Sequence, residues 1–254
     1  MDLGLAGRPA LVAAASRGLG RACAQALAAE GARVAMCSRD AEAIQRARDE
    51  IADATGSEVH ALVADVSTED GATGFVREGA AVLGGCEILV ANAGGPPPGT
   101  FEGLGDDAFT EAFELNFLST IRMTREALPH MRGSGYGRVI VIGSNAMKEP
   151  IPGLMLSNAI RTGVAGWAKT LSFEVAADGI TVNAILPDRI LTDRIRQLAG
   201  SDEGLAAMAK ELPVGRLGDP ADVGNLAAYL ASERASYLTG GFYLVDGGRY
   251  RALY

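Results

Sequence analysis

Strand-like and helix-like segments alternate along the whole chain, and this alternation constrains the fold more than any other feature. Short apolar runs are separated by longer segments with the spacing of amphipathic helices. Strands are expected at residues 9–15, 33–37, 59–64, 88–91, 138–142, 181–186 and 241–245, and helices at residues 20–30, 41–55, 69–83, 106–131, 156–177 and 220–231. Continuous apolar strands joined by helices favour a parallel sheet of about seven strands covered on both faces. The sequence therefore predicts a doubly wound, three-layer α/β/α architecture in a single domain over residues 1–254.

The composition excludes several classes of function. The chain has 254 residues, 48% of them hydrophobic, and a net charge of −8, as expected of a folded rather than a disordered chain. The 23 Lys and Arg residues are outnumbered by 31 Asp and Glu and form no basic run, so a nucleic-acid partner is not expected. No apolar run reaches the roughly 18 residues of a membrane span, and the amino terminus lacks the features of a signal peptide. We therefore expect a soluble cytoplasmic protein without membrane contact.

Three cysteines and two histidines leave little material for metal or disulfide chemistry. Cys23, Cys37 and Cys86 have apolar or small neighbours and no C-x-x-C spacing, and His60 and His130 stand alone. We expect the cysteines to be buried free thiols of a reducing compartment, and we expect neither a metal site nor His-based catalysis.

The turn after the first expected strand has the composition of a phosphate-binding turn. It reads AAASRGLG over residues 13–20 and leads directly into a helix. Its two glycines would let the backbone approach a pyrophosphate, whose charge is favoured by the unpaired N–H groups of a helix amino terminus. An ordinary glycine turn is the alternative, because short glycine motifs also occur without a ligand. The candidate cofactor-binding residues of this turn are Ala14, Ser16, Arg17, Gly18, Leu19 and Gly20.

The end of the second expected strand bears on the choice of cofactor. Dinucleotide folds that bind NAD usually place Asp or Glu about 20 residues after the glycine turn, to bind the ribose 2′-hydroxyl. This chain has Cys37-Ser38-Arg39 there, and Arg17 stands in the turn. Two guanidinium groups suit a 2′-phosphate, so NADP(H) is favoured over NAD(H). The alternative is a pair of solvated surface arginines.

Further motifs follow the third and fourth expected strands and the last one. Asp65-Val66 and Asn92-Ala93-Gly94 come directly after strands, and the tail contains YLTGG at residues 237–241 and VDGG at residues 245–248. With the glycine turn, these motifs resemble the short-chain dehydrogenase/reductase family, and the tail is similar to that of its 3-oxoacyl-[acyl-carrier-protein] reductases. The resemblance covers essentially the whole chain and implies a Rossmann-type sheet, with Asp65 at the adenine and Asn92, Ala93 and Gly94 beside the cofactor. The family's first glycine falls on Ala14, whose methyl group narrows the turn.

The resemblance also assigns the residues of the chemistry. Asn116 matches an asparagine that holds a water and the lysine in a proton relay, and Ser144 matches the serine that hydrogen-bonds the substrate carbonyl. The positions of the family's tyrosine and lysine hold Ser157 and Arg161. A phenol with a pKa of about 10 is a far better proton donor than an aliphatic hydroxyl, and guanidinium stays protonated. Loss of the positioned acid is expected to cost roughly 10²–10⁴ in rate.

Three interpretations of this departure remain open. Ser157 and Arg161 lie on one helical face, so a reductase survives if Ser144 and Arg161 stabilise the alkoxide and a water replaces the phenol. In the second interpretation the chain is a catalytically weak or inactive dinucleotide-binding or regulatory protein. In the third, Lys148 supplies the proton, against the simpler interpretation of a solvated loop lysine.

Two breaks in the pattern, at residues 94–99 and 187–212, are expected to be loops over the carboxyl ends of the strands. Ligands bind at that edge in open α/β sheets, and residues 188–212 are a candidate substrate lid. The resemblance places Pro187, Asp188 and Thr192 in the cofactor site, with Thr192 at the carboxamide. Asp188 stands where the family usually has glycine, and its carboxylate would pair with Arg161, bind a cationic substrate or cap a turn.

The motifs and the resemblance together predict an NADP(H)-dependent oxidoreductase with an atypical active site. Its expected reaction is the reduction of a small carbonyl compound, as in 3-oxoacyl-[acyl-carrier-protein] reductases, or the oxidation of the alcohol. The resemblance further implies a homo-oligomer, either a dimer or a tetramer.

Overall fold

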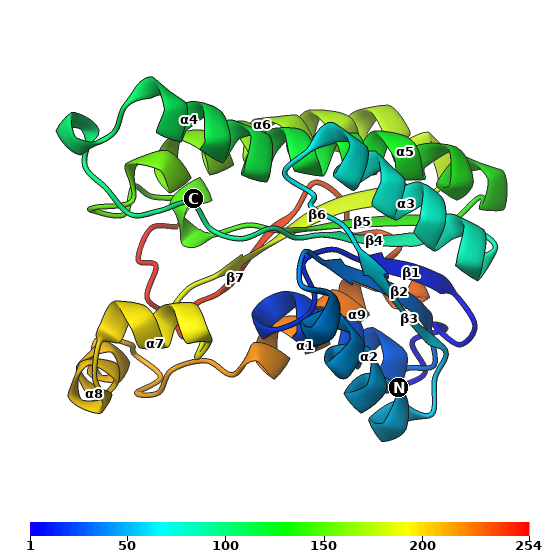
Figure 1. Cartoon of the computed structure of the whole chain (residues 1–254), viewed down its shortest axis with the longest axis horizontal. Coiled ribbons are helices and arrows are strands. Elements are labelled where there is room, and N and C mark those ends of the chain that lie inside the picture. The colour runs from blue at the N-terminus through cyan, green and yellow to red at the C-terminus, as the bar shows by residue number, and fades with distance from the viewer. Residues whose placement is uncertain (254) are drawn as a thin grey trace.

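One parallel sheet of seven strands forms the centre of the computed structural model, which describes residues 1–253 (Figure 1). The strands are β1 (Pro9–Val12), β2 (Arg33–Ser38), β3 (Val59–Val63), β4 (Ile88–Ala91), β5 (Gly137–Ile142), β6 (Ile180–Pro187) and β7 (Phe242–Val245). Their order is β3-β2-β1-β4-β5-β6-β7, and every neighbouring pair is parallel. The strand order reverses between β1 and β4, which is the switch point where such sheets bind ligands. The predicted fold class is confirmed.

Helices cover both faces of the sheet (Figure 1). One face carries α1 (Gly18–Ala29), α2 (Ala41–Thr55) and α9 (Pro220–Ala231), and the other carries α3 (Glu69–Leu83), α5 (Ser119–Ser134) and α6 (Met155–Val175). Because successive side chains of a strand point to opposite faces, Val12 joins the cluster under α1 and Leu11 joins the cluster under α3. The sheet is therefore buried on both sides and forms a rigid base for its carboxyl edge.

Local signals set the bounds of several helices. The helices expected at residues 41–55, 69–83 and 220–231 have those bounds in the structure. Asp40, Thr68 and Asp219 cap their first turns by accepting backbone N–H groups. Gly56 and Gly84 end α2 and α3 in the left-handed conformation that glycine adopts without strain.

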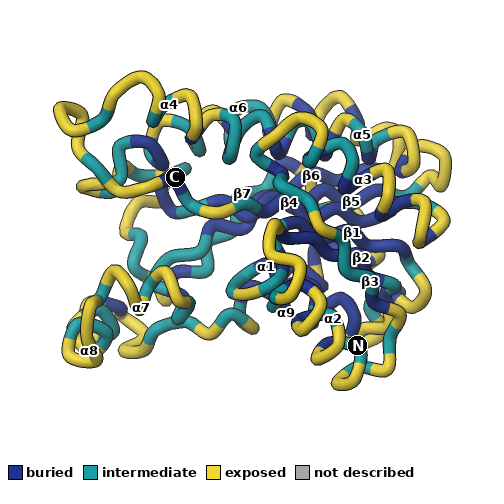
Figure 2. Tube along the Cα trace, in the orientation of Figure 1, coloured by how far each residue is buried: buried dark blue, intermediate teal, exposed yellow. Residues whose placement is uncertain are grey.

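Two expectations about local structure are wrong. The helix expected at residues 106–131 is divided into α4 (Asp106–Phe113), a π-helical turn (Glu114–Leu118) and α5. The break at 187–212 is not simply a loop, because it contains α7 (Asp193–Ala199) and α8 (Asp202–Lys210). Both helices are short and bury no residue, so they lie outside the alternation of buried strands and helices from which the other elements were predicted. Figure 2 shows both as exposed or half-buried segments beyond the buried sheet.

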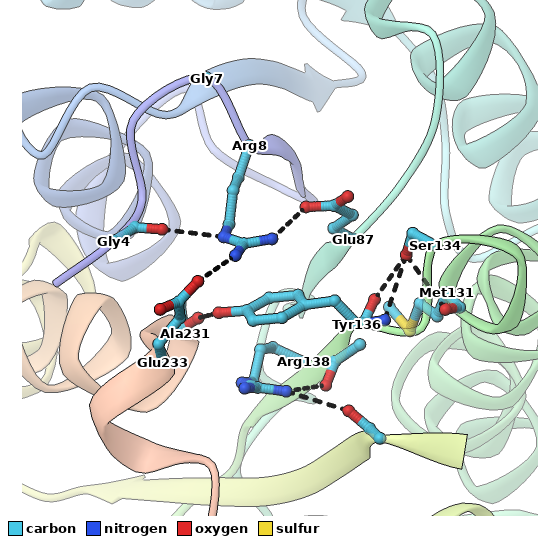
Figure 3. A network of polar contacts seen from close by, with 12 residues as sticks. Gly4, Gly7, Arg8, Glu87, Met131, Ser134, Tyr136, Arg138, Ala231 and Glu233 are labelled. Carbon is cyan, nitrogen blue, oxygen red and sulfur yellow. Dashed lines mark hydrogen bonds and ion pairs between the residues drawn. The ribbon is translucent and has the colours of Figure 1, made fainter.

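A network of polar contacts joins the amino ends of β1, β4 and β5 to the end of α9 (Figure 3). The Tyr136 ring lies between two guanidinium groups, with Arg8 Cζ 3.6 Å and Arg138 Cζ 3.9 Å from its centroid. The Tyr136 hydroxyl donates to the Ala231 carbonyl oxygen at 2.5 Å, and Arg8 pairs with Glu87 at 2.8 Å. Burial raises the pKa of Tyr136 and lowers the pKa of Arg138. This network lies at the edge of the sheet opposite the carboxyl ends, where it ties distant segments together.

The cysteines are three buried free thiols. Burial raises the pKa of Cys23, Cys37 and Cys86 to about 12, so each is held as the unreactive thiol. Within residues 1–253 no helix has the length and apolar character needed to cross a membrane, and no three His, Cys, Asp or Glu side chains gather as a metal site.

Candidate active site

A cavity of about 800 Å³ runs along the carboxyl edge of the sheet. The side bordered by the β1–α1 turn and the ends of β2 and β3 is called the turn side here. The side bordered by β5, β6, α6 and α7 is called the α6 side. The candidate residues that line the cavity are Ala14, Ser16, Arg17, Gly18, Leu19, Arg39, Asp65, Val66, Asn92, Ala93, Gly94, Ser144, Ser157, Arg161, Pro187, Asp188 and Thr192. Gly20 and Asn116 lie behind its wall.

The β1–α1 turn is shaped to leave the first N–H groups of α1 open. Helix α1 begins at Gly18, and Arg17 before it makes no capping hydrogen bond with its side chain. Gly18 has a φ of 59° and Ala14 a φ of 49°, a left-handed conformation that an alanine adopts only under strain. The uncapped amides and the positive end of the helix dipole give this turn the chemistry of a phosphate site.

Gly20 holds the turn against β4 from behind. A Cβ atom at Gly20 would lie 2.4 Å from the Ala14 carbonyl oxygen and 2.7 Å from Asn92 Nδ2. That amide nitrogen donates to the carbonyl oxygens of Ala13 and Ala14, both at 3.2 Å. Asn92 thus braces the turn, and only glycine at position 20 leaves room for the contact.

Both arginines singled out for cofactor choice lie on the turn side, each near a carboxylate. Arg39 Nη1 is 3.8 Å from Asp65 Oδ2, and Arg17 Nη1 is 3.8 Å from Asp193 Oδ2. Partial burial acts to raise the pKa of Asp65, but two hydrogen bonds from Ser67 and the charge of Arg39 outweigh it, so this pKa is lowered. The side chains of Arg17 and Arg39 are 81% and 76% exposed, so both are free to reorient toward a ligand.

The π-helical turn places Asn116. A π turn adds a residue to the helical repeat and often marks a functional position. Asn116 is buried there, and its Nδ2 donates to the Gly94 carbonyl oxygen at 2.8 Å. Its Oδ1 has no hydrogen-bond partner within the described chain. Asn116 therefore supports the loop that follows β4, called the β4 loop here, and its buried Oδ1 remains available as an acceptor.

Ser144, Ser157 and Arg161 line the cavity on the α6 side. Ser144 follows β5, and its Oγ accepts from the Ala146 N–H at 3.2 Å. Ser157 lies in the first turns of α6, and Arg161 follows one turn later. Arg161 Nη1 donates to the carbonyl oxygens of Ile142 at 3.1 Å and Gly143 at 3.2 Å. The cation of α6 is thus fixed against the strand end that carries Ser144.

Arg161 carries its charge in a poorly hydrated position. Burial lowers the pKa of its guanidinium to about 10, and the nearby charge of Arg194 acts in the same direction. A pKa of about 10 keeps the group protonated at neutral pH. Arg161 is therefore a fixed cation on the cavity wall and no proton donor.

Two alternatives from the sequence find no support in the contacts. Asp188 Oδ2 pairs with Arg249 Nη1 at 3.0 Å, and no contact joins it to Arg161 in residues 1–253. The pairing of Asp188 with Arg161, one of the three alternatives for this residue, is therefore wrong. Lys148 is exposed at the end of a short 3₁₀ turn and does not line the cavity. Its proposed role as a proton donor loses its structural basis.

Three arginines that sequence reasoning missed also line the cavity: Arg189, Arg194 and Arg249. Arg194 on α7 reaches the β4 loop, where its Nη2 donates to the Pro96 carbonyl oxygen at 2.9 Å. A Cβ atom at Gly95 would lie 2.9 Å from Arg194 Cζ, so glycine makes room for the guanidinium. Arg249 comes from the segment after β7. The expected loop at residues 94–99 was a usable signal, but nothing in the sequence linked it to α7.

Comparison with known proteins gives matches over nearly the whole chain. A family model described as Enoyl-(Acyl carrier protein) reductase matches residues 13–249. The 3-oxoacyl-[acyl-carrier-protein] reductase FabG of Escherichia coli K12 is 35% identical over 244 residues, covering 96% of this chain and 98% of the relative. L-sorbose reductase from Gluconobacter frateurii, solved with NADPH and L-sorbose, matches with a TM-score of 0.94 and 31% identity over 100% of both chains.

A second solved structure also matches nearly the whole chain. An NADPH-bound short-chain oxidoreductase from Pseudomonas aeruginosa PAO1, described as containing an atypical catalytic center, matches with a TM-score of 0.89 and 32% identity. The match covers 96% of each chain.

Proposed function

The chain belongs to the short-chain dehydrogenase/reductase family, and from this premise we propose that it is an NADP(H)-dependent carbonyl reductase with an atypical active site. Oxidation of the corresponding alcohol is the reverse of the same reaction. One observation carries the proposal: a single cavity of about 800 Å³ is lined by the phosphate-type turn at one side and by Ser144, Ser157 and Arg161 at the other.

The turn side fits a dinucleotide. The uncapped start of α1 would receive the pyrophosphate, and Gly20 holds the turn in place by leaving room for its contact with Asn92. Asp65, with a lowered pKa, is ionised and would accept from the adenine, while Arg17 and Arg39 would hold a 2′-phosphate. Thr192 and Pro187, which also line the cavity, would hold the nicotinamide. NADPH in two similar solved structures supports this assignment.

The α6 side supplies hydrogen bonds and charge to the reacting carbonyl. When bound, the reduced cofactor supplies the two electrons and one proton that the carbonyl carbon gains. Ser144 donates a hydrogen bond to the carbonyl oxygen, and the fixed charge of Arg161 stabilises the negative charge that develops there. Water held by the Ser157 hydroxyl delivers the second proton to that oxygen. Water is a weaker acid than a tuned phenol, so we expect slow turnover.

Two measurements test this function. NADPH fluorescence reports cofactor binding, and loss of NADPH absorbance with a panel of small aldehydes, ketones and oxo acids reports turnover. The Ser144→Ala variant is the control: it should bind NADPH normally and lose turnover roughly 10- to 100-fold, since one hydrogen bond to the developing charge is lost. Failure of the wild-type protein to bind NADPH contradicts the proposal.

The second candidate is a dinucleotide-binding or regulatory protein without turnover. The observation in its favour is the pair Ser157 and Arg161, because neither side chain is a proton donor of suitable strength. Tight NADPH binding without consumption by any carbonyl compound would decide for it.

Replacing Arg17 and Arg39 together by Ala is expected to weaken NADPH binding about 10- to 100-fold, since charge-assisted hydrogen bonds to a phosphate are lost. NADH, which lacks the 2′-phosphate, should lose less than about 3-fold. Arg21→Ala is the matched control, because Arg21 pairs with Glu50 and lies outside the cavity. Equal losses for both cofactors would show that neither arginine binds a 2′-phosphate.

We propose a homodimer or homotetramer, for which the family membership and the 75% exposed Phe173 on α6 are the supporting facts. A cytoplasmic location agrees with three free thiols, which persist in reducing compartments.

A further inference from the structure

Two cations on the α6 side lack a negatively charged partner. Arg161 contacts the protein through Nη1 alone, and both acceptors are backbone carbonyl oxygens. Arg194 likewise donates to carbonyl oxygens, those of Gly95 at 3.4 Å and Pro96 at 2.9 Å. Neither arginine forms an ion pair with any carboxylate in residues 1–253.

The carboxylates that line the cavity interact with groups other than Arg161 and Arg194. Asp188 pairs with Arg249 at 3.0 Å, and Asp193 lies 3.8 Å from Arg17. On the turn side, Asp65 lies 3.8 Å from Arg39, and Asp40 caps α2. The charge of Arg161 and Arg194 is therefore left uncompensated at the one part of the cavity where the substrate is proposed to react.

This arrangement favours an anion. Removing a cation from water without a counter-ion is costly, and an anion that binds beside it recovers part of that cost. The lowered pKa of Arg161 reflects the same burial and the repulsion from Arg194. An anion between the two guanidinium groups would relieve both effects.

The geometry of Arg161 selects the kind of anion. Because Nη1 is engaged, Nε and Nη2 remain, and their parallel N–H groups form the edge of the guanidinium fork. That edge matches the two oxygen atoms of a carboxylate in a bidentate contact. Arg161 also contacts the carbonyl of Gly143, the residue before Ser144, so the anion lies next to the carbonyl that Ser144 holds.

We infer that the substrate is an oxo acid whose carboxylate Arg161 binds through Nε and Nη2, with Arg194 donating from the α7 side. The inference rests on the proposed reductase function and deepens it. The nearness of Ser144 to Arg161 implies that one or two carbon–carbon bonds separate the two groups, as in 2-oxo and 3-oxo acids. The charge on Arg161 then serves both the carboxylate and the developing alkoxide.

Matched pairs of acid and amide test the inference by calorimetry, without turnover. The probes are 2-oxobutyrate with 2-oxobutyramide and acetoacetate with acetoacetamide, titrated into protein saturated with NADP⁺. The acid and the amide of each pair have nearly the same shape, and only the acid carries a negative charge. We expect at least one acid to bind about 10- to 100-fold more tightly than its amide, from charge-assisted hydrogen bonds. Equal affinities within both pairs, or no binding of either acid, would overturn the inference.

Variants of the two arginines test whether they cause the preference for the acid over the amide. Arg161→Gln should remove the preference for the acid and weaken amide binding far less than acid binding, because glutamine lacks the charge and the guanidinium fork but remains polar. The exposed Arg194→Gln should reduce the preference about 3- to 10-fold, and it serves if Arg161→Gln does not fold. Arg216→Gln is the matched control, since Arg216 pairs with Asp222 outside the 800 Å³ cavity. An acid preference that survives both cavity variants rules out the assignment.

Two further measurements distinguish failure of this inference from failure of the proposed reductase function. Inorganic phosphate is titrated as a competing anion, and tighter binding of phosphate than of the acids would overturn the assignment to a carboxylate. NADPH binding and consumption are measured on the same preparation. Consumption that is faster with neutral ketones than with oxo acids overturns the inference alone, whereas absence of NADP(H) binding overturns the reductase itself.

Discussion

Ser157→Tyr combined with Arg161→Lys is expected to raise carbonyl-reductase turnover roughly 10²- to 10⁴-fold, by restoring a positioned proton donor. Ser157 lies on the first turns of α6 and lines the same side of the cavity as Ser144, so we expect a phenol there to reach the reacting oxygen. A lysine one turn later would lower the pKa of that phenol from about 10, as an adjacent ammonium does. The measurement is kcat for NADPH consumption with the best substrate of the screen.

The single variants show which group limits the rate. Ser157→Tyr alone should give part of the gain, and Arg161→Lys alone should give none, because a lysine without the phenol has no acid to tune. Arg161→Lys also removes the guanidinium fork, so the double variant should gain more with neutral ketones than with oxo acids. If kcat stays unchanged while NADPH still binds, the missing acid is not what limits this site.

Gly20→Ala is expected to destabilise the protein by about 2–3 kcal/mol, as overpacking of a rigid backbone contact does. The new Cβ would lie 2.4 Å from the Ala14 carbonyl oxygen and 2.7 Å from Asn92 Nδ2, so α1 must move or the Asn92 hydrogen bonds must break. Either change displaces the phosphate-type turn, and NADPH affinity should fall more than about 10-fold. Urea denaturation and NADPH fluorescence measure the two effects.

Gly74→Ala is the control for this prediction. Gly74 lies inside α3, and a Cβ there would meet no atom within 4 Å. Alanine is the better helix former, so this variant should be about 0.5–1 kcal/mol more stable than the wild type, with unchanged NADPH affinity. Similar free energies of unfolding for the two alanine variants would show that the space at Gly20 is not restrictive.

The parts of the fold that sequence reasoning predicted depend on interactions between near neighbours. Helix α2 is an example, because Asp40 at its start and Gly56 at its end are local capping signals. The strands were recognisable as apolar runs, and the glycine turn followed the first of them. The carboxyl edge of a parallel sheet then brings the residues after each strand together, which is why most candidate site residues line one cavity.

The parts that sequence reasoning missed depend on distant partners. The helix at residues 106–131 breaks at the π turn, where Asn116 bonds to the Gly94 carbonyl oxygen of another segment. No local sequence pattern predicts the hydrogen bond between these two segments. Helices α7 and α8 are short and bury no residue, so the alternation of buried strands and helices gives no sign of them.

The amino-acid sequence by itself determined the layered fold, the phosphate-type turn and the replacement of tyrosine and lysine by Ser157 and Arg161. Hydrophobic period, capping and turn chemistry act over a few residues and can be identified in any short stretch. Only the tertiary structure decided that Asp188 pairs with Arg249, which leaves Arg161 and Arg194 without a carboxylate. The physical reason is that a charge chooses its partner by distance in space, and the folded sheet sets that distance for side chains far apart in the chain.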